Sequence, residues 1–239
     1  MAPLPWQKGI VRHILQETHN TRRFFIQLPD LERFDFQAGQ FVTLDLPIHE
    51  RPGRRWRSYS IASWPDGTNV FELVIVKMEG GAGTNYLFNE VQEGTEISVR
   101  GPQGVFVLPD PMDKDLFLIC TGTGIAPFRS MLHYINKHNP PHRNIYLIFG
   151  TRRRENLLYH EDLLALQEKI PYFHYLPTLS REEWEGRTGY VHAVYEELAK
   201  TRQPADFMLC GWKDMIDEAR KRIQDMGYPK SAIHLESYG

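Results

Sequence analysis

The chain has 239 residues, enough for one large or two ordinary domains, and its 28 basic and 30 acidic residues nearly cancel. This balance argues against a nucleic acid as the main partner. No apolar run approaches the roughly 20 residues that span a bilayer, and the start MAPLPWQKG lacks a signal-peptide core, so we expect a cytoplasmic protein without membrane contact. Two cysteines cannot supply the four thiolates of an iron–sulfur cluster, and the ten scattered histidines indicate no metal site.

The first half of the chain has the pattern of short β-strands separated by turns. Turn residues such as Pro52-Gly53 and the segment 101–104 (GPQG) separate runs that alternate or are rich in β-formers. The predicted strands are residues 9–15, 22–28, 40–46, 57–61, 70–78 and 96–100. A short helix is expected over 85–90, after a glycine-rich run. The pattern predicts a six-stranded antiparallel β-barrel over residues 1–110.

The second half alternates buried-type strands with amphipathic helices, after a proline-containing linker at 108–111. The predicted strands are residues 116–120, 145–150, 173–179, 207–210 and 233–238. The predicted helices are residues 127–138, 159–170, 192–200 and 213–226. Strand and helix in alternation predict an α/β domain with a parallel sheet over residues 111–239. The fold class is therefore a two-domain protein.

The segment 57–63, RSYSIAS, is polar and aromatic where a barrel strand should bury apolar side chains. The Arg57 guanidinium could hold a phosphate, the Tyr59 ring could stack on a heteroaromatic plane, and the Ser60 hydroxyl could bond the edge of that plane. A flavin nucleotide needs these three interactions together. The alternative is a barrel strand with a surface arginine, a core tyrosine and solvated serines.

A glycine turn, TGTGIAP at 121–127, connects the first strand of the second half to a helix. Glycines let the backbone approach a ligand, and the N–H groups of a helix start favour phosphate. The third glycine of the dinucleotide fingerprint is missing, so this turn alone is a weak signal. Further strands end at 149–152, 178–181 and 210–211, and ligands of such sheets bind at the carboxyl ends of the strands.

These motifs, taken in order, resemble the ferredoxin–NADP reductase family over nearly the whole chain. The matching segments are RSYSIAS at 57–63, GAGTNYL at 81–87, GPQG at 101–104, TGTGIAP at 121–127 and Cys210-Gly211. The resemblance implies an FAD-binding barrel, an NAD(P)-binding α/β domain, and hydride transfer between nicotinamide and flavin in the cleft between them.

For the flavin, the resemblance implies that Arg57 pairs with the pyrophosphate, that Tyr59 lies against the isoalloxazine and that Ser60 lies near its reactive N5. Gly83 and Thr84 would face the pyrophosphate from the start of the short helix, where the dipole favours anions. The remaining expected contacts of the FAD and the active-site cleft are Ser58, Val76, Lys77, Thr123 and Tyr238.

The chain end, HLESYG, resembles the plant-type terminus of the family, with a glutamate two residues before an aromatic. Glu236 would then lie at the active site, and Tyr238 would cover the second flavin face. Gly239 is a departure, because the plant-type chain ends at the aromatic. The alternative for Glu236 is an exposed carboxylate on a terminal strand, and the alternative for Cys210 is a small buried hydrophobe, as expected for Cys120. The resemblance implies three catalytic residues: Ser60, Cys210 and Glu236.

For the nicotinamide nucleotide, Ser180-Arg181 resembles the pair that grips the 2′-phosphate in NADPH-using members, and Arg152 occupies a position where bacterial members also place an arginine. Arg187 and Tyr190 would complete this pocket, so we expect NADPH to be preferred over NADH. The alternative is a solvated arginine rim, and some NADH-using relatives carry a similar pair. The other expected contacts are Thr121, Gly122, Gly124, Cys210 and Gly211.

The expected function is FAD-dependent transfer of hydride from NADPH, with single electrons passed to a separate carrier by a monomeric protein. Arg51, Arg54, Arg55 and Arg57, with Trp56 among them, could steer a small acidic carrier such as ferredoxin or flavodoxin. The alternative is that this loop solvates itself and holds the FAD phosphates. Two other functions stay open: an NADH-preferring reductase component of an oxygenase or a diaphorase, and a non-catalytic flavin- or nucleotide-binding regulatory subunit.

Overall fold

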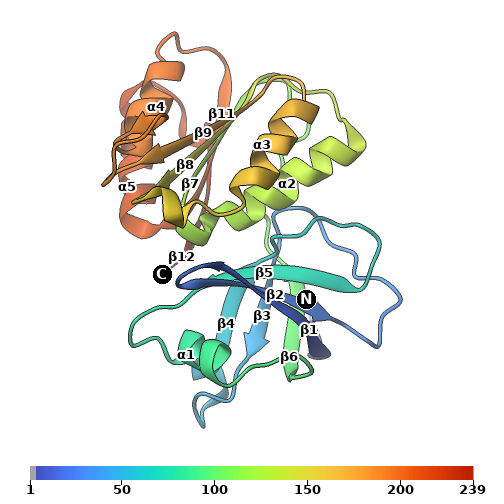
Figure 1. Ribbon diagram of the computed structural model, residues 1–239. Coiled ribbons are helices and arrows are strands. Elements are labelled where there is room, and N and C mark those ends of the chain that lie inside the picture. Colours follow the sequence, from blue (N-terminus) through green and yellow to red (C-terminus); the bar gives the residue numbers. More distant parts are fainter. Residues whose placement is uncertain (1–3, 239) are drawn as a thin grey trace.

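The computed structural model describes residues 4–238 and contains two β-sheets, one in each half of the chain (Figure 1). The first sheet is antiparallel, with the strand order β4-β3-β6-β1-β2-β5. Its strands are β1 (Gln7–Thr18), β2 (Thr21–Gln27), β3 (Phe41–Asp45), β4 (Trp56–Ser60), β5 (Val70–Val76) and β6 (Glu96–Gln103). One helix, α1 (Ala82–Asn89), lies between β5 and β6.

The first sheet curls around an apolar interior. Alternate residues of its strands point inward, so that Val11, Phe24, Val42 and Phe71 are at most 1% exposed and belong to one core cluster. The two edges of the sheet approach each other just after β4, where the Ala62 N–H donates to the Glu72 carbonyl at 2.8 Å. The six-stranded antiparallel barrel predicted from the sequence is thus confirmed.

The second sheet is parallel, with the strand order β10-β9-β8-β7-β11-β12. Its strands are β7 (Asp115–Thr121), β8 (Ile145–Thr151), β9 (Phe173–Leu179), β10 (Arg187–Thr188), β11 (Ala205–Trp212) and β12 (Ile233–Tyr238). Four helices cover it: α2 (Ile125–His138), α3 (His160–Lys169), α4 (Val191–Leu198) and α5 (Lys213–Asp225). Helices α2 and α3 pack on one face, and α4 and α5 pack on the other (Figure 1). The predicted parallel α/β domain is confirmed.

Two details of the secondary structure differ from the prediction. Helix α1 begins at Ala82 instead of residue 85, because the end of the glycine-rich run that was expected to precede it provides its first turn. The two-residue strand β10 was not predicted, since two residues are too short to show a pattern. Within residues 4–238, no helix has the length and apolar character that crossing a membrane requires.

The barrel packs against helix α2 of the second domain through a shared apolar contact. Ala38, Ala62 and Phe106 of the first half belong to the same core cluster as helix α2, and the Phe106 and Phe128 rings lie 5.8 Å apart. At Gly39, with φ of +104°, an added Cβ would lie 2.1 Å from the Phe106 carbonyl oxygen. The carboxyl end of β12 reaches this junction (Figure 1).

Candidate active site

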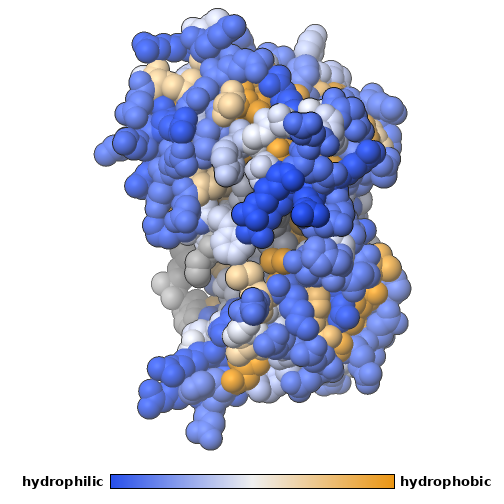
Figure 2. Space-filling view, turned by 60° about the vertical axis from the view of Figure 1, so that its left-hand side comes forward, coloured by the Kyte–Doolittle hydropathy of each residue, from blue (hydrophilic) through white to orange (hydrophobic). Residues whose placement is uncertain are grey.

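A cleft of about 1650 Å³ lies between the barrel and the carboxyl ends of the parallel strands. Figure 2 shows the two lobes of the molecule meeting at a waist, with a mostly hydrophilic surface on this face. Predicted site residues that line the cleft are Arg57, Ser58, Tyr59, Ser60, Val76, Lys77, Thr84, Thr121, Gly122, Thr123, Arg152, Ser180, Arg181, Tyr190, Gly211 and Glu236. Gly83, Gly124, Arg187 and Cys210 do not line it. The predicted stacking of Tyr238 concerns a side chain outside the described part of the structure.

Arg57 and the start of helix α1 form one end of the cleft. An added Cβ at Gly83 would lie 3.0 Å from Arg57 Cγ and 3.2 Å from its Nε, so a larger residue there would require the Arg57 side chain to shift. The guanidinium donates to the carbonyls of Trp56 at 2.7 Å and Arg54 at 3.1 Å. Within residues 4–238, no carboxylate forms an ion pair with it. A cation beside a helix start fits a diphosphate.

Thr84 closes the loop that precedes this helix. Its hydroxyl accepts from the Met78 N–H at 3.1 Å and donates to the Gly81 carbonyl at 3.1 Å. This hydroxyl is therefore engaged in the loop, and Thr84 lines the cleft as a residue that also holds the turn in shape. Its expected contact with the pyrophosphate stays a prediction.

Tyr59 supplies a neutral aromatic wall. Burial raises the pKa of Tyr59 to about 12, and the nearby Arg57 charge opposes this shift only in part. Its phenol is therefore protonated at neutral pH. On the same strand, the Ser58 hydroxyl lies 3.0 Å from that of Thr43, which fixes it along the sheet. A neutral ring on a rigid strand fits the plane of an isoalloxazine.

Ser60 and Glu236 meet in the cleft although they are 176 residues apart in the sequence. Ser60 is 4% exposed, and its hydroxyl donates to Glu236 Oε1. Glu236 comes from β12, where it is paired with Cys210 of β11. Burial raises the pKa of the Glu236 carboxyl, and the Ser60 hydrogen bond opposes this shift. Two residues predicted separately for the active site thus contact each other in the cleft, and their catalytic roles stay predictions.

The raised pKa of Glu236 predicts a pH dependence of stability. Folding favours the protonated carboxyl, so its stabilising contribution is complete below the unfolded pKa of 4.5 and is lost as pH rises through the folded value. We expect the free energy of unfolding of Glu236→Gln, relative to the parent, to increase from pH 4 toward pH 7. Urea denaturation at several pH values measures this, and a constant difference would contradict it.

Cys210 lies directly opposite Cys120 on the neighbouring strand, and both residues are fully buried in the core. Burial raises the pKa of the Cys120 thiol. The chain reaches the cleft at the next residue, Gly211, which has φ of +136° and where an added Cβ would lie 2.6 Å from Thr121 Oγ1. At Gly124 it would lie 2.4 Å from the Cys210 carbonyl oxygen, so this glycine packs the turn against β11. A role for Cys210 beside the nicotinamide stays a prediction.

The ends of β8 and β9 bring Arg152, Ser180 and Arg181 together. The Ser180 N–H donates to the Thr151 carbonyl and the Arg181 N–H to the Arg152 carbonyl, both at 3.0 Å. No carboxylate within residues 4–238 pairs with either arginine side chain. Tyr190, 72% exposed, stands beside them in the cleft. Two uncompensated cations, a hydroxyl and an open ring fit a phosphorylated nucleotide.

Arg187 does not join this group, contrary to the expectation that it completes the pocket. Its guanidinium forms an ion pair with Glu197 of α4 at 2.8 Å, and it does not line the cleft. The predicted basic cluster is also smaller than expected. Arg55 donates to Asp45 at 2.6 Å, which neutralises its charge, and Trp56 lies over the Arg100 guanidinium at 4.6 Å.

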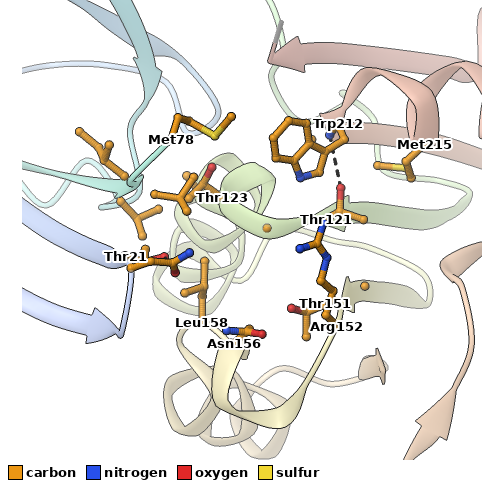
Figure 3. Close-up of a pocket in the computed structure, with 18 of the residues that line it drawn as sticks. Thr21, Met78, Thr121, Thr123, Thr151, Arg152, Asn156, Leu158, Trp212 and Met215 are labelled. Atoms are coloured by element: carbon orange, nitrogen blue, oxygen red, sulfur yellow. Dashed lines mark hydrogen bonds between the residues drawn. The ribbon is translucent and has the colours of Figure 1, made fainter. Parts of the chain in front are cut away.

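Sequence reasoning missed an aromatic residue in the cleft, Trp212. It is 54% exposed, and its backbone N–H donates to Thr121 Oγ1 at 3.3 Å (Figure 3). Its ring lies between Met78 of the barrel and Met215 of α5 in this view. The available signal was a large aromatic directly after Cys210-Gly211 at a predicted strand end.

Within residues 4–238, no three His, Cys, Asp or Glu side chains group as possible metal ligands.

Known proteins share both halves of this architecture. Residues 8–108 match the oxidoreductase FAD-binding domain, and residues 118–221 match the oxidoreductase NAD-binding domain. The two sheets and the cleft between them therefore define an electron-transferring reductase that binds FAD and a nicotinamide nucleotide. The match favours an enzyme over the non-catalytic subunit raised above as an alternative.

The chain belongs to the ferredoxin–NADP reductase family, as its motifs indicated. It is 35% identical over 226 residues to ferredoxin–NADP reductase B of Sorangium cellulosum, with 91% of each chain covered. It is 32% identical to the glycine betaine monooxygenase reductase subunit of Pseudomonas aeruginosa, and covers 66% of that longer chain. A ferredoxin NADP+ reductase from Neisseria gonorrhoeae, solved with bound FAD and NADP, has a TM-score of 0.81 at 26% identity, covering 97% of this chain and 98% of that one.

Proposed function

We propose that the protein transfers hydride from NADPH to FAD and passes electrons singly to a separate carrier protein of the ferredoxin or flavodoxin type. FAD, when bound, supplies the conversion between two-electron and one-electron chemistry. The observation that carries the proposal is the Ser60–Glu236 hydrogen bond, which joins the barrel to the α/β domain inside the cleft. It holds a hydroxyl proton and a half-buried carboxyl where the two nucleotides would meet.

The residues on the two sides of this pair would bind different nucleotides. Arg57 and the start of α1 would hold the FAD diphosphate, and Tyr59 would orient the ring. Across the cleft, the turn after β7 would carry the nicotinamide nucleotide. Rigid strands and a helix start fix these groups in advance, which lowers the entropy cost of bringing two rings into contact.

A preference for NADPH is supported by the free cations at the ends of β8 and β9. Arg152 and Arg181 lack carboxylate partners among residues 4–238, whereas Arg154 and Arg187 are neutralised by Glu185 at 3.2 Å and Glu197 at 2.8 Å. A 2′-phosphate would compensate the two charges that the fold leaves uncompensated.

A second candidate is a reductase component of an oxygenase. It is favoured by the 32% identity to the monooxygenase reductase subunit of Pseudomonas aeruginosa, of which the chain spans about two thirds. In this case the electrons would pass to an iron–sulfur centre on another polypeptide.

Anaerobic stopped-flow spectroscopy on the FAD-loaded protein tests both functions. We expect NADPH to bleach the flavin spectrum faster than NADH at equal concentration, and the reduced protein to reduce an added ferredoxin or flavodoxin. A faster reaction with NADH, together with inert carriers and rapid reduction of an oxygenase iron–sulfur protein, would favour the second function. A protein that neither nucleotide reduces would contradict both.

A further inference from the structure

The contact between the two domains contains a buried carboxylate, Glu72, in the otherwise apolar strand β5. Glu72 is 3% exposed. On the barrel side, Arg23 donates to it from Nε at 2.6 Å and from Nη2 at 3.2 Å. From the α/β domain, the Tyr159 hydroxyl donates to Oε1 at 2.6 Å and Arg129 Nη1 donates to Oε2 at 3.2 Å. Both carboxylate oxygens are thus hydrogen-bonded to both domains.

Arg129 is equally enclosed, at 6% exposed, on helix α2. Besides Glu72, it donates from Nε to Asp162 at 2.7 Å and from Nη1 to the Ala62 carbonyl at 2.9 Å. Its guanidinium also lies 4.4 Å from the centre of the Tyr159 ring. Burial, followed by the Glu72 charge, raises the pKa of Tyr159, so this hydroxyl keeps its proton and donates. We call Glu72, Arg23, Arg129 and Tyr159 the interdomain cluster.

Such a cluster is a costly way to hold two domains together. Removing charges from water costs several kcal/mol per ion, and well-packed apolar residues stabilise a contact of the same size as effectively. The neighbouring Phe106–Phe128 contact already provides apolar packing. In some proteins, buried polar or ionic groups of this kind select a single arrangement of the packed parts. The cluster is therefore suited to setting geometry.

The cluster is connected by short, rigid links to both halves of the cleft. Ala62, whose carbonyl binds Arg129, follows Ser60 by two residues on the flavin side. On the other side, Arg129 lies in the same helix that begins directly after Gly124. At about 1.5 Å per helical residue, Arg129 is roughly 7.5 Å along the helix axis from Gly124, in the turn after β7 that would carry the nicotinamide nucleotide.

We propose that the interdomain cluster sets the separation of the two half-sites, with Glu72 and Arg129 acting as positioning residues for hydride transfer. This inference rests on the proposed function. A displacement of about 1 Å between reacting groups can cost about 100-fold in rate, so a small relaxation of the domain contact matters.

The first test is kinetic and uses the FAD-loaded protein. We expect Glu72→Gln and Arg129→Met each to lower the limiting rate of flavin reduction about 10- to 100-fold, with the NADPH dissociation constant changed less than about threefold. Because the two residues act through one contact, the double variant should be no slower than the slower single variant. Asp206→Asn is the matched control, since this buried carboxylate pairs with Lys114 at 3.2 Å within one domain. We expect its limiting rate to be unchanged.

The second test measures domain orientation without turnover. Spin labels on Glu32→Cys and Lys221→Cys, both exposed, report the interdomain distance, and the fully buried Cys120 and Cys210 should escape labelling. We expect a narrow distance distribution in the parent and in Asp206→Asn, and a broader one in Glu72→Gln.

The outcomes separate this inference from the proposed function. An unchanged distribution and an unchanged limiting rate in Glu72→Gln would overturn the positioning role. If Glu72→Gln does not fold, Tyr159→Phe, which keeps the ring and removes one donor, decides by the same two measurements. If the parent protein is not reduced by any nicotinamide nucleotide, the proposed function fails, and the distance distributions still test whether the cluster fixes the domains.

Discussion

Replacing Ser60 with alanine will lower the limiting rate of flavin reduction by NADPH about 100-fold, a loss typical of removing one preorganised donor from an active site. Ser60 is 4% exposed, and its hydroxyl donates to Glu236 across the domain boundary. Alanine removes this donor and leaves the half-buried Glu236 carboxyl without it. Because Tyr59 and Arg57 remain, we expect the FAD content and the NADPH dissociation constant to change little. Anaerobic stopped-flow reduction over a range of NADPH concentrations separates the limiting rate from binding.

Three further variants define the cause of the loss. Ser60→Thr keeps a hydroxyl and should recover most of the rate. Ser60→Ala combined with Glu236→Gln should be less slow than the product of the single effects, because the two side chains form one contact. Ser98→Ala removes an exposed hydroxyl from the same barrel and should react like the parent. A full rate in Ser60→Ala would contradict the proposed role.

Replacing Arg181 with alanine will raise the Michaelis constant for NADPH about 10- to 100-fold and leave that for NADH nearly unchanged. A hydrogen bond to a charged group contributes about 1.5–3 kcal/mol, and each 1.4 kcal/mol is about tenfold in affinity. Arg181 borders the cleft without a carboxylate partner among residues 4–238, so its charge is available to a 2′-phosphate. Steady-state kinetics with both nucleotides and one artificial acceptor measure the change.

Arg187→Ala is the matched control for this prediction. Arg187 follows Arg181 by six residues, but it is paired with Glu197 and does not line the cleft. We expect a change of less than about threefold in the NADPH constant, since an exposed ion pair contributes little. Equal losses for NADPH and NADH in Arg181→Ala, or an equally large effect of Arg187→Ala, would show that the 2′-phosphate is bound elsewhere.

Both sheets could be predicted from the sequence. Alternation of polar and apolar residues, or a continuous apolar run, indicates which side chains of a strand face its own core. Most residues that line the cleft were also predicted, but only because several motifs occur in the order that the family shows. No local pattern links Ser60 to Glu236. Arg187 was misplaced because its partner, Glu197, lies one helix further along the chain, where spacing says nothing about pairing.

The interdomain cluster was missed for a related reason. Glu72 is one polar residue in the apolar run VFELVIV, and Arg129 is one cation in the apolar helix start IAPFRSML. Each is by itself compatible with an exposed position. Only the structure shows that both are enclosed, at 3% and 6% exposed, and paired with each other across the domain contact. A charged residue inside a strongly apolar run was the signal that could have identified them.

The long separation of Ser60 and Glu236 also orders the biosynthesis of the site. Residue 236 leaves the ribosome 176 residues after its partner, at about 5–20 residues per second, and β12 docks at the edge of a sheet whose other strands are already made. A nascent chain can therefore expose its flavin half-site for about 10 to 35 seconds before the nucleotide half-site is complete. Chains that stop before β12 would lack the carboxylate entirely, whichever other contacts they have formed.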